Sequence, residues 1–468
     1  MRFWLPLAAL ISFGRLFQSG VLWPEEGLPL AAARQILAGD LLYRDIWFDK
    51  PPLLAWLYAA FLLLAPQSIL ALRFLGVLYI LAISWTGFLL ARRWFDLAAA
   101  RSTAFLLAFF LTFYHPSATV PLAADLLLLL PHLAAFYFQA ASRPLAAGLC
   151  AGLAFHLNSK AVLVLLAASA AGPVIPLLAG FALAILAGLA PIALTGAWAG
   201  YFEQVWQWGA SYAGTPFSSH PWQLGLERTA AWLGFHAALI LGAALFLRRP
   251  SAHRRTILLW IALSLLGVAA GARFFPRYYF QLLPALAVAA GAGWALLPRR
   301  PILAAALALS LLVPTVRFGR LNLRLALGRS FEWRDTAIDA SSRRAAALVA
   351  RLTSPGDPIF VWGFRPEIYY YARRPAASRF LESQPLTGVL ADRHLGRSDA
   401  FLPEQAARRR RQAALELAQR PPAVIVDGLG PYNPNLSIEL YPEFRSLLDN
   451  YRPATHTPGA RLWRRSGP

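Results

Sequence analysis

The sequence predicts a polytopic α-helical membrane protein of about eleven transmembrane helices, followed by a small C-terminal α/β domain. Of its 468 residues, 58% are hydrophobic and only 14% are charged, whereas a soluble protein carries about a quarter charged residues. Apolar runs of about 20 residues, the length that a helix needs to cross a bilayer, recur through the first two thirds of the chain. A secretory signal peptide would explain only the first of these runs.

Eleven apolar segments make up the predicted transmembrane helices. They are residues 3–19, 69–91, 99–114, 125–141, 145–158, 161–175, 177–198, 230–247, 256–272, 279–297 and 302–316. The sixth and seventh segments must be joined by a tight turn near Gly172, Pro173 and Pro176, because glycine and proline are the residues that favour turns.

Short arginine clusters between the segments determine the predicted orientation. They contain Arg92, Arg93, Arg101, Arg143, Arg248, Arg249, Arg254, Arg255, Arg299 and Arg300. All of them fall on the side of the N-terminus, and the positive-inside rule makes that side cytoplasmic. We therefore expect a multi-pass membrane protein with a cytoplasmic N-terminus. This topology accounts for the net charge of +21 without a nucleic-acid partner.

The opposite, outer face collects the acidic residues of the membrane part. Eight of the nine acidic residues in the range 1–316 lie at this face: Glu25, Glu26, Asp40, Asp45, Asp49, Asp125, Glu203 and Glu227. Acidic residues have little influence on topology, so their segregation predicts a chemical use. The outer loop 20–68 also contains the apolar stretch 51–65, which is too short to span a bilayer and is expected to lie at the interface.

Residues 317–468 are predicted to form an extracytoplasmic domain, leaving 1–316 as the membrane domain. The stretches "PIFVWG" (358–363) and "PAVIVDG" (422–428) are typical of short buried strands. Two further segments have the pattern of amphipathic helices, namely 335–352 and 404–419. Strands that alternate with helices predict a small α/β domain.

The acidic candidates for chemistry are Glu25, Glu26 and Asp125. Glu25 and Glu26 follow Pro24, where a helix could begin, and a helix N-terminus favours acids. A carboxylate at this water–lipid boundary would also suit a general base. Asp125 stands at the mouth of the fourth segment, either as a helix cap or as a functional acid, since an acid is costly to hold there.

Three basic candidates lie on the same outer face: Lys50, Lys160 and Arg277. Lys50 and Lys160 are the only lysines among the 44 basic residues, and an ammonium group differs chemically from a guanidinium group. Each of the three could snorkel towards lipid head groups. Together they would also suit a lipid-phosphate substrate, with cations on its phosphate and carboxylates on an acceptor. The single Cys150 excludes an intrachain disulfide and a cysteine-based metal site, and no metal ligands are predicted.

The stretch "EEGLPLAAARQILAGDLLYRDIWFDKPPL" (25–53) resembles the first outer loop of the bacterial GT-C glycosyltransferases related to aminoarabinose transferase and the protein O-mannosyltransferases. Their usual form has Asp-Glu, a helix, and a Lys-Pro-Pro turn before an amphipathic helix. The resemblance extends over most of the chain in order. It includes residues 118–137, 152–160, 276–291 and 357–380.

The resemblance implies roles for the outer-face residues. Glu25 takes the position of the family's catalytic Asp, with Glu26 beside it, and Asp125 takes the second acidic position. Lys50 matches the lysine that contacts the lipid phosphate, and Lys160 and Arg277 match further basic positions. Because Glu25 stands where the family usually has Asp, its carboxylate is displaced by a methylene, which leaves Glu26 or Asp45 as the alternative base. Asp49 and Arg44 are further secondary candidates in the same loop.

The implied activity is transfer of a sugar from a polyprenyl-phosphate donor to a lipid, glycan or protein acceptor, by inverting direct displacement in the cell envelope. No cofactor is certain, since some GT-C enzymes use a divalent cation and others do not. Two alternatives are a transporter or flippase for lipid-linked sugars and an O-antigen ligase or polymerase. A transporter is expected to have inverted repeats, which the sequence lacks, and a ligase relies on a large middle loop rather than on the first loop.

Overall fold

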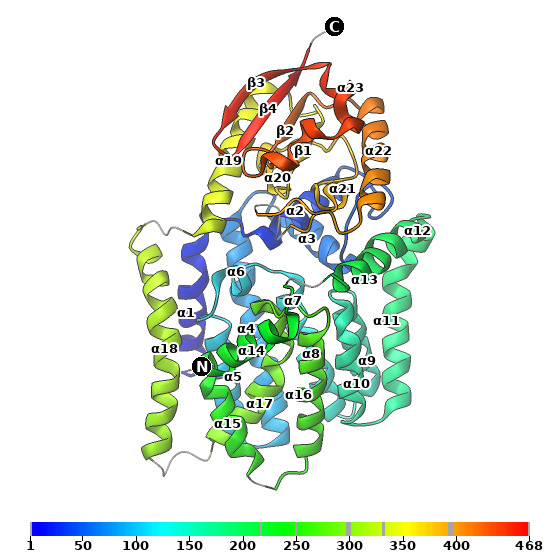
Figure 1. The fold of residues 1–468 in the computed structure, drawn as a ribbon. Helices are drawn as coiled ribbons and strands as arrows, with labels where there is room; N and C mark the ends of the chain where they lie inside the picture. Colours follow the sequence, from blue (N-terminus) through cyan, green and yellow to red (C-terminus); the bar gives the residue numbers. More distant parts are fainter. Residues whose placement is uncertain are drawn as a thin grey trace.

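The protein has a helical bundle at one end and, at the other, a small four-stranded sheet with its flanking helices, which is called the sheet domain below (residues 334–465). The first loop (20–68) lies between them (Figure 1). The division into a membrane domain and an extracytoplasmic domain stays a prediction. This computed structural model describes residues 2–215, 218–248, 250–295, 301–329, 333–391 and 396–466.

Helices occur in all eleven predicted apolar segments. They are α1 (Trp4–Arg15), α4 (Ile69–Trp94), α5 (Leu97–Phe110), the pair α7 and α8 (Ala124–Leu127 and Leu129–Ala140), α9 (Pro144–Phe155), α10 (Val162–Ser169), α11 (Val174–Leu194), α15 (Ala237–Leu247), α16 (Arg254–Ala269), α17 (Leu283–Trp294) and α18 (Pro301–Ala326). Within the described residues, α4, α11 and α18 are long and apolar enough to cross a membrane. The count of eleven spans therefore stays a prediction.

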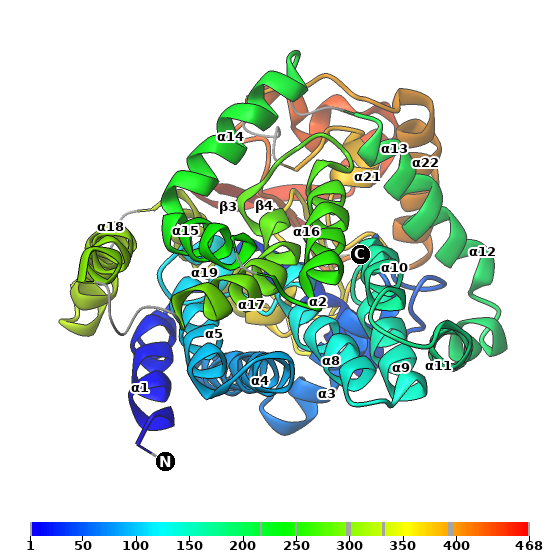
Figure 2. The same cartoon turned by 90° about the horizontal axis from the view of Figure 1, so that it is seen from below.

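The predicted segment 230–247 is not one straight helix. The chain bends by 83° between α14 (Pro221–Phe235) and α15, so that α15 is seen end-on and α14 from the side in Figure 2. His236 occupies the bend: its ring stacks on Trp232 at 3.9 Å between centroids, and its Nδ1 donates to the Trp232 carbonyl at 2.9 Å. The Trp232 carbonyl also accepts from the His236 backbone amide at 2.9 Å, so the backbone and the side chain of His236 both bind the last turn of α14.

One end of the bundle carries the arginine clusters. Arg93 at the end of α4 and His253 directly before α16 border one cavity with the turns that follow α8 and α10. These chain ends lie at the end of the bundle away from the sheet domain (Figure 1). Three arginines of the predicted clusters, Arg249, Arg299 and Arg300, lie outside the described residues, as does the end of the predicted segment 279–297.

The sheet domain contains the two predicted strands and both predicted helices. The strands β1 (Ile359–Trp362) and β2 (Val424–Asp427) pair in parallel, with Ile359 opposite Val424. The helices are α19 (Arg334–Leu352) and α22 (Pro403–Gln419).

A C-terminal hairpin completes this sheet, and the sequence analysis did not predict it. It consists of β3 (Tyr451–Thr457) and β4 (Ala460–Arg465) in the strand order β1-β2-β4-β3. The outer strand β3 is mostly exposed, so it lacks the apolar run that marks a buried strand.

The first outer loop lies between the bundle and the sheet domain. It forms α2 (Pro24–Leu37), which begins at the predicted proline, and α3 (Pro52–Leu64) in place of the predicted interfacial stretch. The helix α2 packs against α20 (Glu367–Ala372) of the sheet domain, and a Cβ added at Gly27 would lie only 3.0 Å from the Glu367 carboxylate. A side chain at this position would require Glu367 or Pro366 to shift by a few tenths of an ångström.

A buried ion pair anchors the start of α2 to α4. The Arg73 guanidinium binds both carboxylate oxygens of Glu26, at 2.6 and 2.7 Å, and both side chains are 0% exposed. Arg73 also donates to the carbonyls of Gln18 and Val21, and the Trp23 amide donates to Glu26. This network holds the entry of the first loop against the bundle.

We expect Glu26→Gln to destabilise the fold strongly, because it leaves Arg73 buried without a counter-charge. Breaking a buried pair by removing one partner costs about 3–5 kcal/mol. The midpoint of thermal unfolding of the purified protein in detergent measures the effect. Asp45→Asn, which breaks the surface pair between Arg44 and Asp45, is the control and is expected to change the midpoint little. Equal midpoints for the two variants would contradict the anchoring role of Glu26.

Candidate active site

A cavity of about 540 Å³ lies where the bundle, the first loop and the sheet domain meet. Nine charged residues line it: Glu25, Asp49, Lys50, Asp125, Lys160, Arg277, Arg334, Asp335 and Glu382. Six of them are candidates from the sequence, and they come from segments as far apart as the first loop and the start of α17. The first loop and the sheet domain, which contribute to this lining, lie at the opposite end of the bundle from the turn between α10 and α11 and from the start of α16 (Figure 1).

Arg277 joins the two main acidic candidates at the centre of the cavity. Its Nη1 lies 2.6 Å from Glu25 Oε1, and its Nε lies 3.4 Å from Asp125 Oδ2. The second Asp125 oxygen accepts a hydrogen bond of 2.9 Å from the Asn158 amide. Two carboxylates separated by 100 residues in sequence therefore flank one guanidinium group.

Lys50 is held by its neighbours in the first loop. Its ammonium group lies 3.0 Å from Asp49 Oδ1, and its carbonyl accepts a hydrogen bond of 2.7 Å from the Tyr43 hydroxyl. Burial by itself would lower the pKa of Lys50, but Asp49 and Glu25 more than offset this and hold the pKa above its ordinary value. The ammonium group is therefore charged at neutral pH.

Lys160 lies beside the same centre on the corner between α9 and α10. Its ammonium group is 4.0 Å from the centroid of the Tyr278 ring, in reach of a cation–π contact. The Asn158 side chain accepts from the Lys160 amide at 3.1 Å. Asn158 thus connects the Lys160 corner to Asp125.

Three candidates from the sequence do not line the cavity: Glu26, Asp45 and Arg44. Successive residues of an α-helix point about 100° apart, so at the start of α2 Glu25 faces the cavity while Glu26 faces Arg73. Asp45 and Arg44 pair with each other at 2.9 Å on the surface. Glu26 and Asp45, which the sequence offered as alternative bases, thus lie outside the cavity that Asp125 lines, and which carboxylate acts as the base stays a prediction. Asp49, a secondary candidate, does line the cavity.

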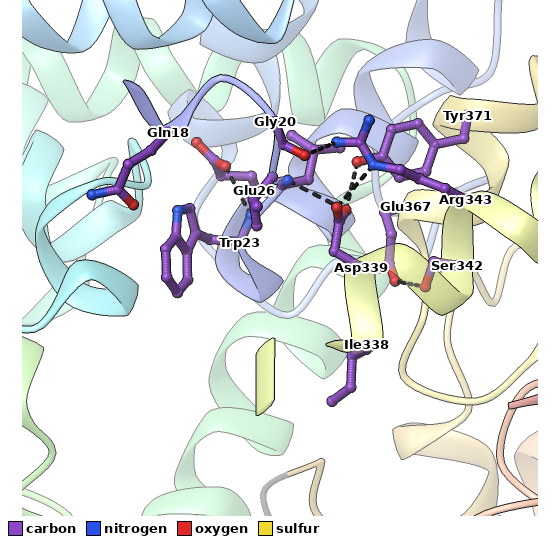
Figure 3. Close-up of polar contacts among 12 residues, drawn as sticks. Gln18, Gly20, Trp23, Glu26, Ile338, Asp339, Ser342, Arg343, Glu367 and Tyr371 are labelled. Atoms are coloured by element: carbon purple, nitrogen blue, oxygen red, sulfur yellow. Dashed lines mark hydrogen bonds and ion pairs between the residues drawn. The ribbon is translucent and has the colours of Figure 1, made fainter. Parts of the chain in front are cut away.

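Helix α19 holds the entry of the first loop from the side of the sheet domain, as Figure 3 shows. Asp339 accepts hydrogen bonds from the Leu22 amide at 3.3 Å and from the Tyr371 hydroxyl at 2.5 Å. Arg343 donates to the Gly20 carbonyl at 2.7 Å and to Asp339 at 2.8 Å. The segment that precedes Glu25 is thus fixed from both sides.

The sheet domain contributes lining residues that the sequence analysis missed. They are Arg334, Asp335, Ile338, Phe364, Glu382, Gln384 and Ala391. Most of them lie at helix ends or in connecting segments, where periodicity carries no signal. Only the docking of this domain onto the first loop brings them to the cavity.

The residues present do not form an evident site for a divalent cation. Over the described ranges of the chain, no group of three or more His, Cys, Asp and Glu side chains is arranged to hold a metal ion. The oxygens of Glu25 and Asp125 that face the cavity centre are directed at Arg277 instead.

Comparisons with known proteins agree with the resemblance found in the first loop. Residues 49–194 match the model of the dolichyl-phosphate-mannose-protein mannosyltransferase family. No curated protein matches the sequence.

Solved structures share the architecture over nearly the whole chain. ArnT from Cupriavidus metallidurans, bound to undecaprenyl phosphate, is 14% identical, with a TM-score of 0.65, and the match covers 98% of this chain and 97% of that chain. The archaeal oligosaccharyltransferase AglB from Archaeoglobus fulgidus, in complex with an inhibitory peptide and a dolichol-phosphate, is 13% identical, with a TM-score of 0.51 and coverage of 99% and 74%. The chain therefore has the fold that these two structures share.

Proposed function

We propose that the protein is a glycosyltransferase that moves a sugar from a polyprenyl-phosphate donor to an acceptor hydroxyl in this cavity. The observation that carries the proposal is the convergence of Glu25, Asp125 and Arg277 with the two lysines in one cavity of about 540 Å³. The structural similarity to ArnT bound to undecaprenyl phosphate and to AglB with a dolichol-phosphate supports this class of donor.

The cations of the cavity would bind the phosphate of the donor. Lys50 is charged at neutral pH because of Asp49 and Glu25, and Lys160 is held over Tyr278. Arg277 is bound to Glu25 and Asp125. When a phosphate arrives, Arg277 can share its donors between the phosphate and these carboxylates, since a guanidinium group offers five N–H donors.

Glu25 is the proposed base. It takes the proton of the acceptor hydroxyl while the acceptor oxygen attacks the anomeric carbon of the sugar. A new carbon–oxygen bond forms as the bond from the anomeric carbon to the phosphate oxygen breaks. The polyprenyl phosphate leaves with the bonding electron pair, and Lys50, Lys160 and Arg277 stabilise its charge. A single displacement of this kind inverts the anomeric centre.

Asp125 is proposed to position Arg277 and the acceptor. It is fixed by Asn158 on one oxygen and by Arg277 on the other. Glu26 is paired with Arg73, and Asp45 is paired with Arg44. Of the acidic residues considered as the base, Glu25 and Asp125 are therefore the ones that meet at the centre of the cavity.

The proposed topology places the cavity at the outer face of the bacterial inner membrane. In this arrangement the eleven apolar segments span the bilayer, the arginine-rich end is cytoplasmic, and residues 317–468 form the extracytoplasmic domain. A lipid-sugar transporter is expected to hold its substrate near the bilayer midplane, whereas the charged lining here lies at one end of the bundle. The acceptor would be a lipid, glycan or protein of the cell envelope.

We expect Glu25→Gln to lower the transfer rate by about 10²–10⁴-fold, the contribution of a general base. Asp125→Asn should lower it too, by a smaller factor, because the amide still bonds Asn158 or Arg277. The measurement is sugar transfer in membranes supplied with defined polyprenyl-phosphate sugars. Asp45→Asn is the control, and unchanged transfer in both Glu25→Gln and Asp125→Asn would refute the assignment.

We expect Lys50→Met to weaken binding of undecaprenyl phosphate by about 10- to 150-fold, because one charge-assisted hydrogen bond of about 1.5–3 kcal/mol is lost. Binding to the purified protein can be followed by its thermal stabilisation. The raised pKa of Lys50 keeps it protonated through neutral pH and above, so its contribution is expected to be constant from pH 7 to 9. Arg44→Met removes a cation outside the cavity, and equal weakening by that variant would contradict a specific role of Lys50.

A further inference from the structure

Glu382 is a carboxyl group in the cavity that the proposed transfer reaction does not use. It comes from the sheet domain, its residue is only 3% exposed, and it lines the cavity with Phe364, Gln384 and Ala391. Its Oε2 accepts a hydrogen bond of 2.8 Å from the backbone amide of Gln384. A buried carboxyl group is costly unless it has a role or a partner, so its place in a ligand cavity calls for an explanation.

The segment that carries Glu382 is bound to the first loop by a hydrogen bond and a ring contact. The Trp47 amide donates to the Arg379 carbonyl at 2.9 Å, and the Trp47 ring packs on Phe380 at 5.4 Å between centroids. Asp49 and Lys50 follow Trp47 by two and three residues. This contact places Glu382 beside the Asp49–Lys50 pair and fixes its position in the cavity.

The other end of the segment is fixed within the sheet domain. The Ser383 amide donates to the carbonyl of Gly363, at the end of β1, at 3.2 Å. The Gln384 side chain accepts from the Ala391 amide at 2.7 Å. The Glu382 side chain is therefore presented by a backbone that is bound on both sides.

Charge divides the cavity into two regions. Arg277 and Lys160 lie with Glu25 and Asp125 in the first region, where they match the phosphate and the reacting hydroxyl. Glu382 instead has Asp49 and Lys50 as its charged neighbours, and that lysine is already paired with Asp49 at 3.0 Å. Because its lysine is paired with Asp49, this region has no surplus positive charge to hold a second anion besides the donor phosphate.

Glu382 is held mostly in its neutral form at pH 7. Burial, with the negative charge of Asp49 as a second cause, raises the pKa of Glu382 to about 8, although the Gln384 amide and Lys50 oppose the shift. The remaining charged groups of the cavity are Glu25, Asp125, Lys160, Arg277, Arg334 and Asp335. A neutral carboxyl group offers one O–H donor and one carbonyl acceptor. A sugar hydroxyl can accept a hydrogen bond from the first and donate one to the second.

We infer that Glu382, with Gln384 and Asp49, forms a subsite that binds an uncharged, hydroxyl-bearing acceptor, namely a glycan end, on the side of the sheet domain. This inference rests on the proposed glycosyl transfer and assigns its acceptor class. Glu382 is an acceptor-binding residue in this arrangement, and Glu25 remains the base. The sheet domain thereby takes part in the choice of acceptor.

The test is steady-state transfer by the full-length protein in lipid nanodiscs, with a panel of polyprenyl-phosphate hexoses as donors. Octyl α-mannoside is the hydroxyl acceptor and octyl glucosaminide is the amine-bearing one. Glu382→Ala is expected to raise the KM for octyl α-mannoside about tenfold or more, with the donor KM and kcat changed less than about threefold, since one buried hydrogen bond is lost. Glu382→Gln keeps a neutral side chain that can both donate and accept a hydrogen bond. Its KM for octyl α-mannoside should therefore stay within about threefold of the wild-type value at pH 7.

The pH dependence separates this role from a merely structural one. The Glu382 carboxyl is protonated below its raised pKa and ionised above it, so the wild-type KM for octyl α-mannoside should rise above about pH 8. Glu382→Gln should abolish that rise. Glu443→Gln, which removes a carboxylate bound to Arg410 elsewhere in the sheet domain, is the matched control and should behave as the wild type in both tests.

Three results would overturn the subsite. The first is an unchanged acceptor KM in Glu382→Ala, and the second is a change confined to the donor KM. The third is a preference for octyl glucosaminide that Glu382→Gln removes, because it would show that the ionised form binds an amine. If the wild type forms no product with any acceptor, the proposed function fails and the subsite with it. Normal transfer with an acceptor KM that is insensitive to Glu382 refutes the subsite alone. Unfolding midpoints of all variants confirm that the kinetics report on folded protein.

Discussion

The buried ion pair between Glu26 and Arg73 fixes the place where the first outer loop leaves the bundle. A charge pair without solvent contact is stable only if both partners are fully hydrogen-bonded, and here the Gln18 and Val21 carbonyls and the Trp23 amide complete the network. Because α2 begins at this point, Glu25 is rotated by about 100° from Glu26 and enters the cavity. The position of the proposed base therefore depends on an interaction in which the base takes no part.

The charged groups at the centre of the cavity form ion pairs with one another. Arg277 is paired with Glu25 and Asp125, and Lys50 is paired with Asp49. In the proposed reaction, the donor phosphate would take over part of the hydrogen bonds of these cations, which would free carboxylate oxygens for an acceptor.

The sheet domain is part of the cavity wall rather than an appendage of the bundle. Asp339 and Arg343 hold the loop before Glu25 (Figure 3), and the Arg379 carbonyl holds the loop before Lys50. Both ends of the first loop that carry proposed functional residues are thus bound to the sheet domain. A change in how this domain packs on the loop would therefore move Glu25 and Lys50 together.

The sequence by itself determined the elements whose signals are local. Apolar length placed helices at all eleven segments, Pro24 and Pro51-Pro52 marked the starts of α2 and α3, and two apolar stretches in the last third became β1 and β2. The charged candidates of the sequence also include six of the nine charged residues that line the cavity, namely Glu25, Asp49, Lys50, Asp125, Lys160 and Arg277, because charged residues in an apolar chain are conspicuous.

Only the tertiary structure decided the partners. It turned Glu26 towards Arg73, bent the chain at His236, added the exposed hairpin of β3 and β4, and brought Glu382 from more than 300 residues away to Asp49. Hydrophobic length and periodicity report whether a residue is buried, which is a property of its own segment. Which group it meets there depends on how distant segments pack, and that information is spread over the whole chain.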